Sequence, residues 1–402
     1  MPIIIKIIKF IVDLFFLPFV IIFSFIARFK NKSIDIGLGP EPLINNIFHK
    51  KALKLYGYSA ETFVNSVYYI TDDFDIRADL IFKGLFKAII NHYLFLYSIF
   101  KYKCIYIYFN GGPLGFTSFL WKIEPFLYKI AKVKTVVMPY GGDVQEMSRS
   151  HNLLFKHVMS KDYPRHKFRR KLIEKKIDLW SRYATHIIGG CEWVDYMYYW
   201  DTLMLAHFSI DTNEWKMESN YVIPNKYTKE RPLRVLHAPN HKEIKGTKYF
   251  IRAIDELKAE GYPIELILVE KIPNYQIKEI MKEVDVIADQ LIVGWYAMFA
   301  IESMSMGKLV LCYIREDLEE FYTASGLLEK NELPLIKCSP LNIKEVLTRI
   351  LDNAEELRIY ENKSKNYVAK HHSIQSVGLV FDYINTSIGI KKSSKENEIM
   401  RN

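Results

Sequence analysis

Short apolar runs alternate with longer amphipathic stretches along most of this 402-residue chain, and this alternation constrains the fold more than any other feature. Runs of this length suit buried strands, and the intervening stretches have the apolar spacing of helices that pack on a sheet. The predicted strands lie within residues 33–43, 61–70, 103–112, 134–144, 184–190, 233–240, 264–270, 286–292, 308–314 and 333–338, and the first, third and fourth of these segments end in a glycine-containing turn. Strands that alternate with helices favour parallel sheets, so the sequence predicts an α/β protein with two Rossmann-like domains facing a cleft.

The division between the two domains is predicted at a polar connector, residues 223–232, which contains two prolines and several charges. Long helices are predicted at residues 79–100 and from Cys191 onward. The predicted segments are an apolar N-terminal anchor (1–32), two Rossmann-like domains (33–225 and 226–370), a C-terminal helix (371–388) and a disordered tail (389–402).

The N-terminal segment is almost wholly apolar from Phe10 to Ala27, with Asp13 and Pro18 inside the run and basic residues on both sides. Its length is marginal for a membrane span, and the basic flanks give no clear orientation. An interfacial or re-entrant helix, broken near Pro18, is the favoured interpretation. A true span and a helix docked on protein remain as alternatives. Both membrane interpretations place the globular part on the cytoplasmic face of the cell membrane.

Composition limits the classes of partner and cofactor. The net charge of +9 suits a phosphorylated ligand or an anionic membrane surface, but it is too dispersed to indicate nucleic acid. The four cysteines form no CxxC pair and indicate reduced core thiols. The sequence contains no zinc, P-loop or HExxH pattern, so neither a metal site nor a bound cofactor is predicted.

Two charged residues of the second half stand in unusual places. Lys245 and Gly246 lie where a helix should begin after a strand, a position that suits a diphosphate. Glu302 lies inside an otherwise apolar helix, where a carboxylate needs a partner such as a ribose diol or a buried arginine. Gly294 and Tyr296 precede that helix and would let its start approach a phosphate or sugar. An ordinary solvated lysine is the alternative for Lys245.

Glycines end several predicted strands of the first half. Gly39, Gly112 and Gly142 follow three of these strands, and Asp143 comes directly after the last of them. These residues are candidates for binding an acceptor or a sugar at the carboxyl edge of the sheet. The alternatives are that the glycines only make turns and that Asp143 caps the next helix.

Several segments resemble retaining glycosyltransferases of the GT-B type, in the broad bacterial group that builds surface polysaccharides. In the first half these segments are SIDIGLGPEP and YGGDV, followed by HFSIDTNEW just before the linker. In the second half HAPNHKEIKGT resembles the donor-phosphate segment, and GWYAMFAIESMSMGKLV resembles the E-x7-E region. The resemblance spans about residues 34–385.

The resemblance implies roles for individual residues. Lys245 would bind the donor diphosphate, and Asn240 and His241 occupy the place of an arginine-containing turn. Glu302 matches the second glutamate, which would hold the ribose, whereas the first glutamate falls at Gly294. The implied co-substrate is a nucleotide diphosphate-sugar, with a saccharide or lipid-linked acceptor in the N-terminal domain. The resemblance identifies no catalytic residue.

Two other functions fit the same sequence. One is a sugar-nucleotide epimerase of the GT-B fold, which would need acid and base carboxylates in the cleft. The other is a non-catalytic, membrane-bound partner that binds donor without turnover, which the missing glutamate at Gly294 permits. The products formed from donor alone and from donor with a membrane extract distinguish these functions.

Overall fold

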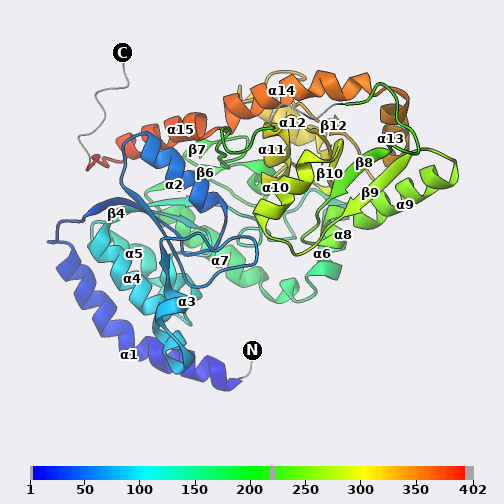
Figure 1. The fold of residues 1–402 in the computed structure, drawn as a ribbon. Helices are drawn as coiled ribbons and strands as arrows, with labels where there is room; N and C mark the ends of the chain where they lie inside the picture. The colour runs from blue at the N-terminus through cyan, green and yellow to red at the C-terminus, as the bar shows by residue number, and fades with distance from the viewer. Residues whose placement is uncertain (1–2, 218–222, 394–402) are drawn as a thin grey trace, which may run out of the picture. The chain divides into compact units, whose positions relative to one another are not determined.

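The chain folds into two compact units, each built around a parallel sheet flanked by helices (Figure 1). The computed structural model describes residues 3–217 and 223–393. Unit 1 comprises residues 1–146, 170–203 and 377–402, and unit 2 comprises residues 147–169 and 204–376, each within the described ranges. Two parallel α/β sheets were predicted from the alternation of the sequence, and this prediction is confirmed.

Unit 1 contains a seven-stranded sheet in the order β3-β2-β1-β4-β5-β6-β7. All its strand pairs are parallel, and its central strands are buried on both faces, which explains their nearly continuous apolar sequences. The strands are β1 (Ile34–Leu38), β2 (Ala60–Val64), β3 (Ile76–Arg77), β4 (Tyr102–Tyr108), β5 (Lys134–Met138), β6 (His186–Gly189) and β7 (Thr202–Leu203). The main helices are α1 (Ile3–Ala27), α2 (Asn45–Leu55), α4 (Ile90–Lys101), α5 (Glu124–Ile130), α7 (Arg170–Tyr183) and α15 (Ile374–Ser387).

Unit 2 contains a five-stranded parallel sheet in the order β12-β11-β10-β8-β9. Its core joins apolar residues of these strands to the inner faces of the helices. The strands are β8 (Leu233–His237), β9 (Ile264–Leu268), β10 (Val286–Gly294), β11 (Leu309–Ile314) and β12 (Ile336–Lys337). The helices are α6 (Leu153–Asp162), α8 (Lys242–Lys245), α9 (Thr247–Ala259), α10 (Asn274–Lys282), α11 (Met298–Ser305), α12 (Glu316–Ala324), α13 (Ile343–Asp352) and α14 (Glu355–His371).

Two predicted helices differ from the observed structure. Residues 79–100 form α3 (Ala78–Ile81), the 3-10 helix η1 (Gly84–Ile89) and α4 instead of one helix. Gly84 has a φ of 58°, in the left-handed region, which a continuous right-handed helix does not accommodate. The helix predicted from Cys191 is only a 3-10 turn, η5 (Cys191–Asp195). Here Cys191 itself has a φ of 54°.

The units are not contiguous in sequence, whereas the predicted domains are. The segment with α6 belongs to unit 2 because Asn152 joins it to β10: its Nδ2 donates to the carbonyl of Ile292 at 2.6 Å. The C-terminal segment returns to unit 1 at Val377, where Asn385 accepts a hydrogen bond from Tyr106 of β4 at 3.1 Å. Of the tail predicted to be disordered, Ser393 binds Asp35, and residues 394–402 lie outside the described residues.

The apolar N-terminal segment is a single helix, α1, that continues through Pro18 without the predicted break. It packs against α4 and α5 of the same unit, and Figure 1 shows it along the outside of these helices. Within the described residues, the stretch Lys6–Ala27 is long and apolar enough to cross a membrane.

Candidate functional site

The predicted donor residues of unit 2 lie in the segments that follow the adjacent strands β8 and β10. Lys245 follows β8, Glu302 follows β10, and the neighbouring strand β9 leads into α10. In a parallel sheet the carboxyl ends of all strands lie at one edge, so the segments that follow β8, β9 and β10 share that edge of unit 2. The candidate site therefore lies at this edge and is formed by residues of unit 2.

Lys245 is held by a carboxylate that the sequence analysis did not identify. Its Nζ lies 2.6 Å from Oδ1 of Asp289, a residue of β10 whose side chain is 1% exposed. The Lys245 side chain is 20% exposed, so it is partly open to solvent beside this ion pair. Asp289 orients this ammonium group and compensates its charge. The sequence signal that could have identified Asp289 is the presence of a carboxylate within the otherwise apolar run of β10.

Gly246 connects two helices beside Lys245. Its φ of 76° lies in the left-handed region, which ends α8 and allows α9 to begin at once with Thr247. His237, at the end of β8, binds both the Thr247 hydroxyl at 2.9 Å and the Ala288 carbonyl at 2.7 Å. Burial lowers the pKa of His237 to about 4, so a neutral imidazole fixes the start of α9 to the sheet.

Glu302 is 3% exposed within α11, and its side-chain partner is an amide. Nδ2 of Asn274, the first residue of α10, donates to Oε1 of Glu302 at 2.9 Å. The partner observed among the described residues is thus an amide, whereas the sequence suggested a ribose diol or a buried arginine. Burial raises the pKa of Glu302 to about 8, although the hydrogen bond from Asn274 opposes the shift. At neutral pH the carboxyl is therefore mostly protonated, able to donate one hydrogen bond as well as accept.

Asn240 and His241 are exposed in the loop between β8 and α8. The His241 ring contacts the hydroxyl of Tyr163, with Nε2 at 2.6 Å. Next to it, Oδ2 of Asp162 accepts a hydrogen bond from the backbone N–H of Ile244 at 2.9 Å. The end of α6 therefore positions the loop that carries these two predicted residues.

Gly294 and Tyr296 have different positions in the turn between β10 and α11. Gly294 has a φ of 102°, and a Cβ there would lie 2.7 Å from Cδ of Arg315, so the turn requires glycine. Tyr296 is fully buried, and its hydroxyl lies 2.6 Å from that of Tyr367 and 2.9 Å from Nε2 of His372. The structure thus places Tyr296 beneath the turn, where it supports the backbone of the candidate site.

In unit 1, Asp143 is fully buried and links two loops at the carboxyl edge of the sheet. It accepts hydrogen bonds from the backbone N–H groups of Phe109 (2.9 Å), Tyr140 (3.0 Å) and Gly141 (3.0 Å). Burial raises the pKa of Asp143 to about 7 against these bonds. Its carboxylate organises the loops after β4 and β5, rather than projecting from them.

Two of the predicted glycines permit close packing at this edge. A Cβ at Gly39 would lie 2.0 Å from the carbonyl oxygen of Phe63, and one at Gly112 would lie 2.6 Å from Oε1 of Glu124. Glu124 is buried, with a pKa raised to about 8, and it accepts a hydrogen bond from the N–H of Leu114 at 2.8 Å. Gly142 has open space around its Cβ position. Gly142 is thus the predicted glycine of this edge that leaves room beside the backbone.

A polar cluster that the sequence analysis did not identify lies at the same edge of unit 1. Nδ2 of Asn110 donates to Oε1 of Glu41 and to the hydroxyl of Tyr140, both at 2.7 Å. The Tyr140 hydroxyl also donates to Oε1 of Glu41 at 3.2 Å. The three residues follow β1, β4 and β5, which are adjacent strands. Glu41 and Tyr140 are partly exposed and give this edge hydrogen-bonding groups suited to hydroxyl-rich ligands.

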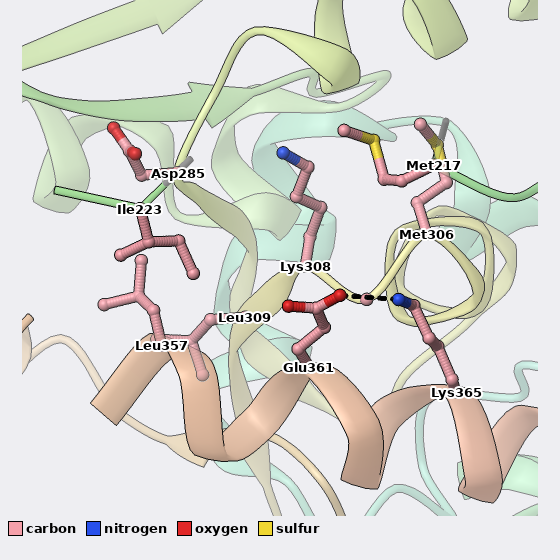
Figure 2. Close-up of a pocket in the computed structure, with 10 residues that line it drawn as sticks. Met217, Ile223, Asp285, Met306, Lys308, Leu309, Leu357, Glu361 and Lys365 are labelled. Atoms are coloured by element: carbon pink, nitrogen blue, oxygen red, sulfur yellow. Dashed lines mark hydrogen bonds and ion pairs between the residues drawn. The ribbon is translucent and has the colours of Figure 1, made fainter. Parts of the chain in front are cut away.

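A pocket of about 310 Å³ lies elsewhere in unit 2 and contains none of the predicted site residues (Figure 2). Asp285 and Lys308, two of its lining residues, directly precede β10 and β11, so the pocket lies at the amino ends of these strands. Burial lowers the pKa of Lys308 to about 8, and its Nζ donates to the Val284 carbonyl at 2.7 Å. The candidate site and this pocket are therefore at opposite ends of the sheet. No group of three or more metal-ligating side chains occurs among the described residues.

Comparisons with known proteins bear on the fold. No model of a protein family matches the sequence, and no curated protein matches it. Among solved structures, the chain is similar to HepE from Anabaena in complex with UDP, at 12% identity and a TM-score of 0.55, over 89% of this chain and 100% of HepE. It is also similar to sucrose-phosphate synthase from Thermosynechococcus elongatus, at 10% identity and a TM-score of 0.57, over 89% and 99% of the two chains.

A glycosyltransferase from Rickettsia africae is similar at 11% identity and a TM-score of 0.51, over 89% of this chain and 99% of that one. At these identities the likeness shows the fold. The predicted GT-B fold class is confirmed, and its structural neighbours are glycosyltransferases.

Proposed function

We propose that this protein is a glycosyltransferase that moves a sugar from a nucleotide diphosphate-sugar to a saccharide or lipid-linked acceptor, with retention, in surface polysaccharide or glycolipid synthesis. The observation that supports it best is the pair Lys245 and Glu302, which lie in α8 and α11 after the adjacent strands β8 and β10 at the carboxyl edge of unit 2. A partly exposed lysine suits a diphosphate, and a carboxyl group suits a ribose diol.

In this proposal unit 2 binds the donor. Lys245 binds the diphosphate and stabilises the charge that develops on it as the sugar leaves, assisted by the start of α9 beside Gly246. Asn240 and His241 form the outer side of the same loop. Glu302 holds the ribose, and Gly294 allows the backbone before α11 to approach the donor closely. No metal or bound cofactor is assigned to this chemistry.

Unit 1 contributes the acceptor side of the proposal. Gly39, Gly112 and Gly142 shape the loops at its carboxyl edge, and Asp143 holds two of these loops together. With retention, the leaving phosphate itself takes the proton of the incoming hydroxyl, so no separate base is named. The proposed place of reaction is the cytoplasmic face of the cell membrane, where nucleotide sugars and lipid-linked acceptors meet.

The test combines donor binding with product analysis. HepE was solved with UDP and with UDP-glucose, so these two ligands are the first donor probes for calorimetry on the full-length protein. A panel of nucleotide sugars, each with and without a membrane lipid extract, is then analysed by mass spectrometry. A glycosylated lipid or saccharide supports the proposal. An epimerised nucleotide sugar from donor alone indicates the epimerase, and binding without any product indicates the non-catalytic partner.

The residue assignment is tested by Lys245→Ala with Lys248→Ala as the matched control. Lys248 lies three residues further along, is 49% exposed and pairs with Glu243. Loss of Lys245 should reduce transfer at least about tenfold, the scale of one charge-assisted contact, and the control should retain wild-type activity. Equal activity of both variants would remove Lys245 from the site.

A further inference from the structure

The helix α1 has a buried side and an exposed side, and both are well defined. Asp13, Val20, Ser24 and Ala27 are at most 2% exposed and follow helical spacing, so they form one stripe against the body of unit 1. The opposite side carries large apolar residues, among them Phe15 at 63% exposure. An exposed apolar row of this length on a protein surface marks an interaction site.

Polar contacts fix the buried side of α1 to unit 1. Oδ1 of Asp13 lies 3.0 Å from Nε2 of His92 on α4, and the two side chains are each 2% exposed. Oδ2 of Asp13 accepts hydrogen bonds from the N–H groups of Ser118 (2.6 Å) and Phe119 (3.3 Å). The ring of Phe16 stacks on His92 with centroids 4.5 Å apart. Asp13 is the only acidic residue of α1, and these contacts with unit 1 satisfy the hydrogen-bonding capacity of its carboxylate.

The end of α1 is fixed as well. Nζ of Lys32 donates to the carbonyl of Ala27, the last residue of α1, and to that of Ala131, which follows α5. If α1 crossed a bilayer away from the body of unit 1, Asp13 would lose these partners and enter hydrocarbon, where no donor replaces them. The geometry therefore favours a helix that stays along the side of unit 1.

A second apolar segment adjoins α1. Leu80 and Ile81 of α3 are 60% and 55% exposed, and Phe86 of η1 is 68% exposed. The helix α1 contacts η1, and both pack on α4, so the two apolar segments belong to one region of unit 1 (Figure 1). We call this region, the exposed side of α1 with Leu80, Ile81 and Phe86, the apolar face.

Basic residues accompany the apolar face. Lys83 and Lys87 alternate with the exposed apolar residues of the second segment and are themselves exposed. At the ends of α1, Lys6, Arg28 and Lys30 are exposed too. Apolar side chains combined with lysine and arginine complement the headgroups and acyl boundary of an anionic bilayer. A purely apolar protein partner would gain nothing from these charges.

We propose that the apolar face docks in the plane of an anionic lipid bilayer, with α1 lying flat in the interface and Leu80, Ile81 and Phe86 inserting beside it. The protein is then monotopic, and both ends of α1 remain on the side of the catalytic units. The proposal rests on the proposed function only for the choice of the cytoplasmic side, since lipid binding does not require sugar transfer.

The first experiment measures insertion of single residues. Phe15→Cys and Phe86→Cys are labelled with an environment-sensitive fluorophore in the full-length protein, with Leu341→Cys, which is 97% exposed in unit 2, as the control. The four native cysteines are buried and give little background. With vesicles of phosphatidylcholine and phosphatidylglycerol, positions 15 and 86 should both shift to the blue and position 341 should not. A shift at position 15 alone overturns in-plane docking, and no shift at either position overturns the lipid surface.

The second experiment separates in-plane docking from a span and from protein association. In sealed membrane vesicles, Lys6→Cys and Lys30→Cys should react with an impermeant maleimide from the same side, whereas a span would expose them on opposite sides. Lys83→Gln and Lys87→Gln, which each remove one positive charge, should each weaken binding to anionic vesicles by about fivefold at low salt. Unchanged binding, or a blue shift at position 15 that depends on protein concentration without vesicles, would instead indicate an interface between protein molecules.

Discussion

The substitution Glu302→Gln should stabilise the protein at neutral pH while it impairs the proposed transfer. Burial raises the folded-state pKa of Glu302 from 4.5 to about 8. Between these values the folded state binds a proton that the unfolded state has released, so the stability of the wild-type protein falls as pH rises through this window. Glutamine is neutral and has nearly the shape of the protonated acid, and it keeps the oxygen that accepts from Asn274.

The expected magnitude follows from the same two pKa values. Each pH unit between them corresponds to about 1.4 kcal/mol, so the wild-type protein loses roughly 3 kcal/mol at about pH 7 and roughly 5 kcal/mol above pH 8. Glu302→Gln should recover these amounts, and the two proteins should be equally stable near pH 4. The gain in stability with loss of function is typical of a polar group retained for binding.

The assay is urea unfolding of the wild type and of Glu302→Gln at several pH values, with hydrogen exchange of α11 amides to assign the transition to unit 2. Glu320→Gln is the matched control, because Glu320 is an exposed residue of α12 in the same unit. Its stability difference from the wild type should stay within a few tenths of a kcal/mol at every pH. A difference between Glu302→Gln and wild type that does not grow with pH would refute the buried, protonated carboxyl.

Three further predictions concern other parts of the chain. Lys245→Ala should destabilise unit 2 because it leaves the buried carboxylate of Asp289 unpaired, and the double variant with Asp289→Asn should recover stability in urea unfolding but not donor binding in calorimetry. Asp143→Asn should lower the free energy of unfolding by about 1–3 kcal/mol, because an NH2 group replaces one of the two carboxylate oxygens that accept hydrogen bonds from three backbone N–H groups. The loops should then become less ordered, which hydrogen exchange measures, and activity should fall with them. Deletion of residues 1–30 should move the protein from the membrane to the soluble fraction on sedimentation, and continued sedimentation with membranes would contradict the proposed anchor.

The fold was predictable because its strands are buried on both faces. Such strands have nearly continuous apolar sequences, as in β4 and β10, and these stand out from the amphipathic helices between them. The exchange of segments between the units was not predictable from such local patterns. Asn152 joins α6 to a β10 carbonyl 140 positions away, and nothing near Asn152 in the sequence indicates that contact.

The candidate site was predictable for the residues whose chemistry conflicts with their surroundings. Glu302 stood out because a carboxylate lies within an apolar helix, and Lys245 because a cation precedes a glycine at a helix start. Their partners, Asp289 and Asn274, come from other strands and helices, so only the tertiary structure brings them together. The cluster of Glu41 with Asn110 and Tyr140 was missed for the same reason, since three separate loops supply it.

The electrostatics of the candidate site follow from these partners. The ammonium of Lys245 is compensated by Asp289, and the Glu302 carboxyl is mostly protonated at neutral pH, so neither residue leaves a net charge buried at this edge. An anionic donor therefore meets an ammonium that is already oriented and does not have to overcome a nearby ionised glutamate. Because Asp289 is buried behind Lys245 rather than exposed beside it, the ion pair can persist while the ammonium's remaining hydrogens bind phosphate. The pairing with Asp289 thus holds the Lys245 ammonium in place, whereas the buried carboxyl of Glu302 costs stability as pH rises, as expected for a group retained for binding.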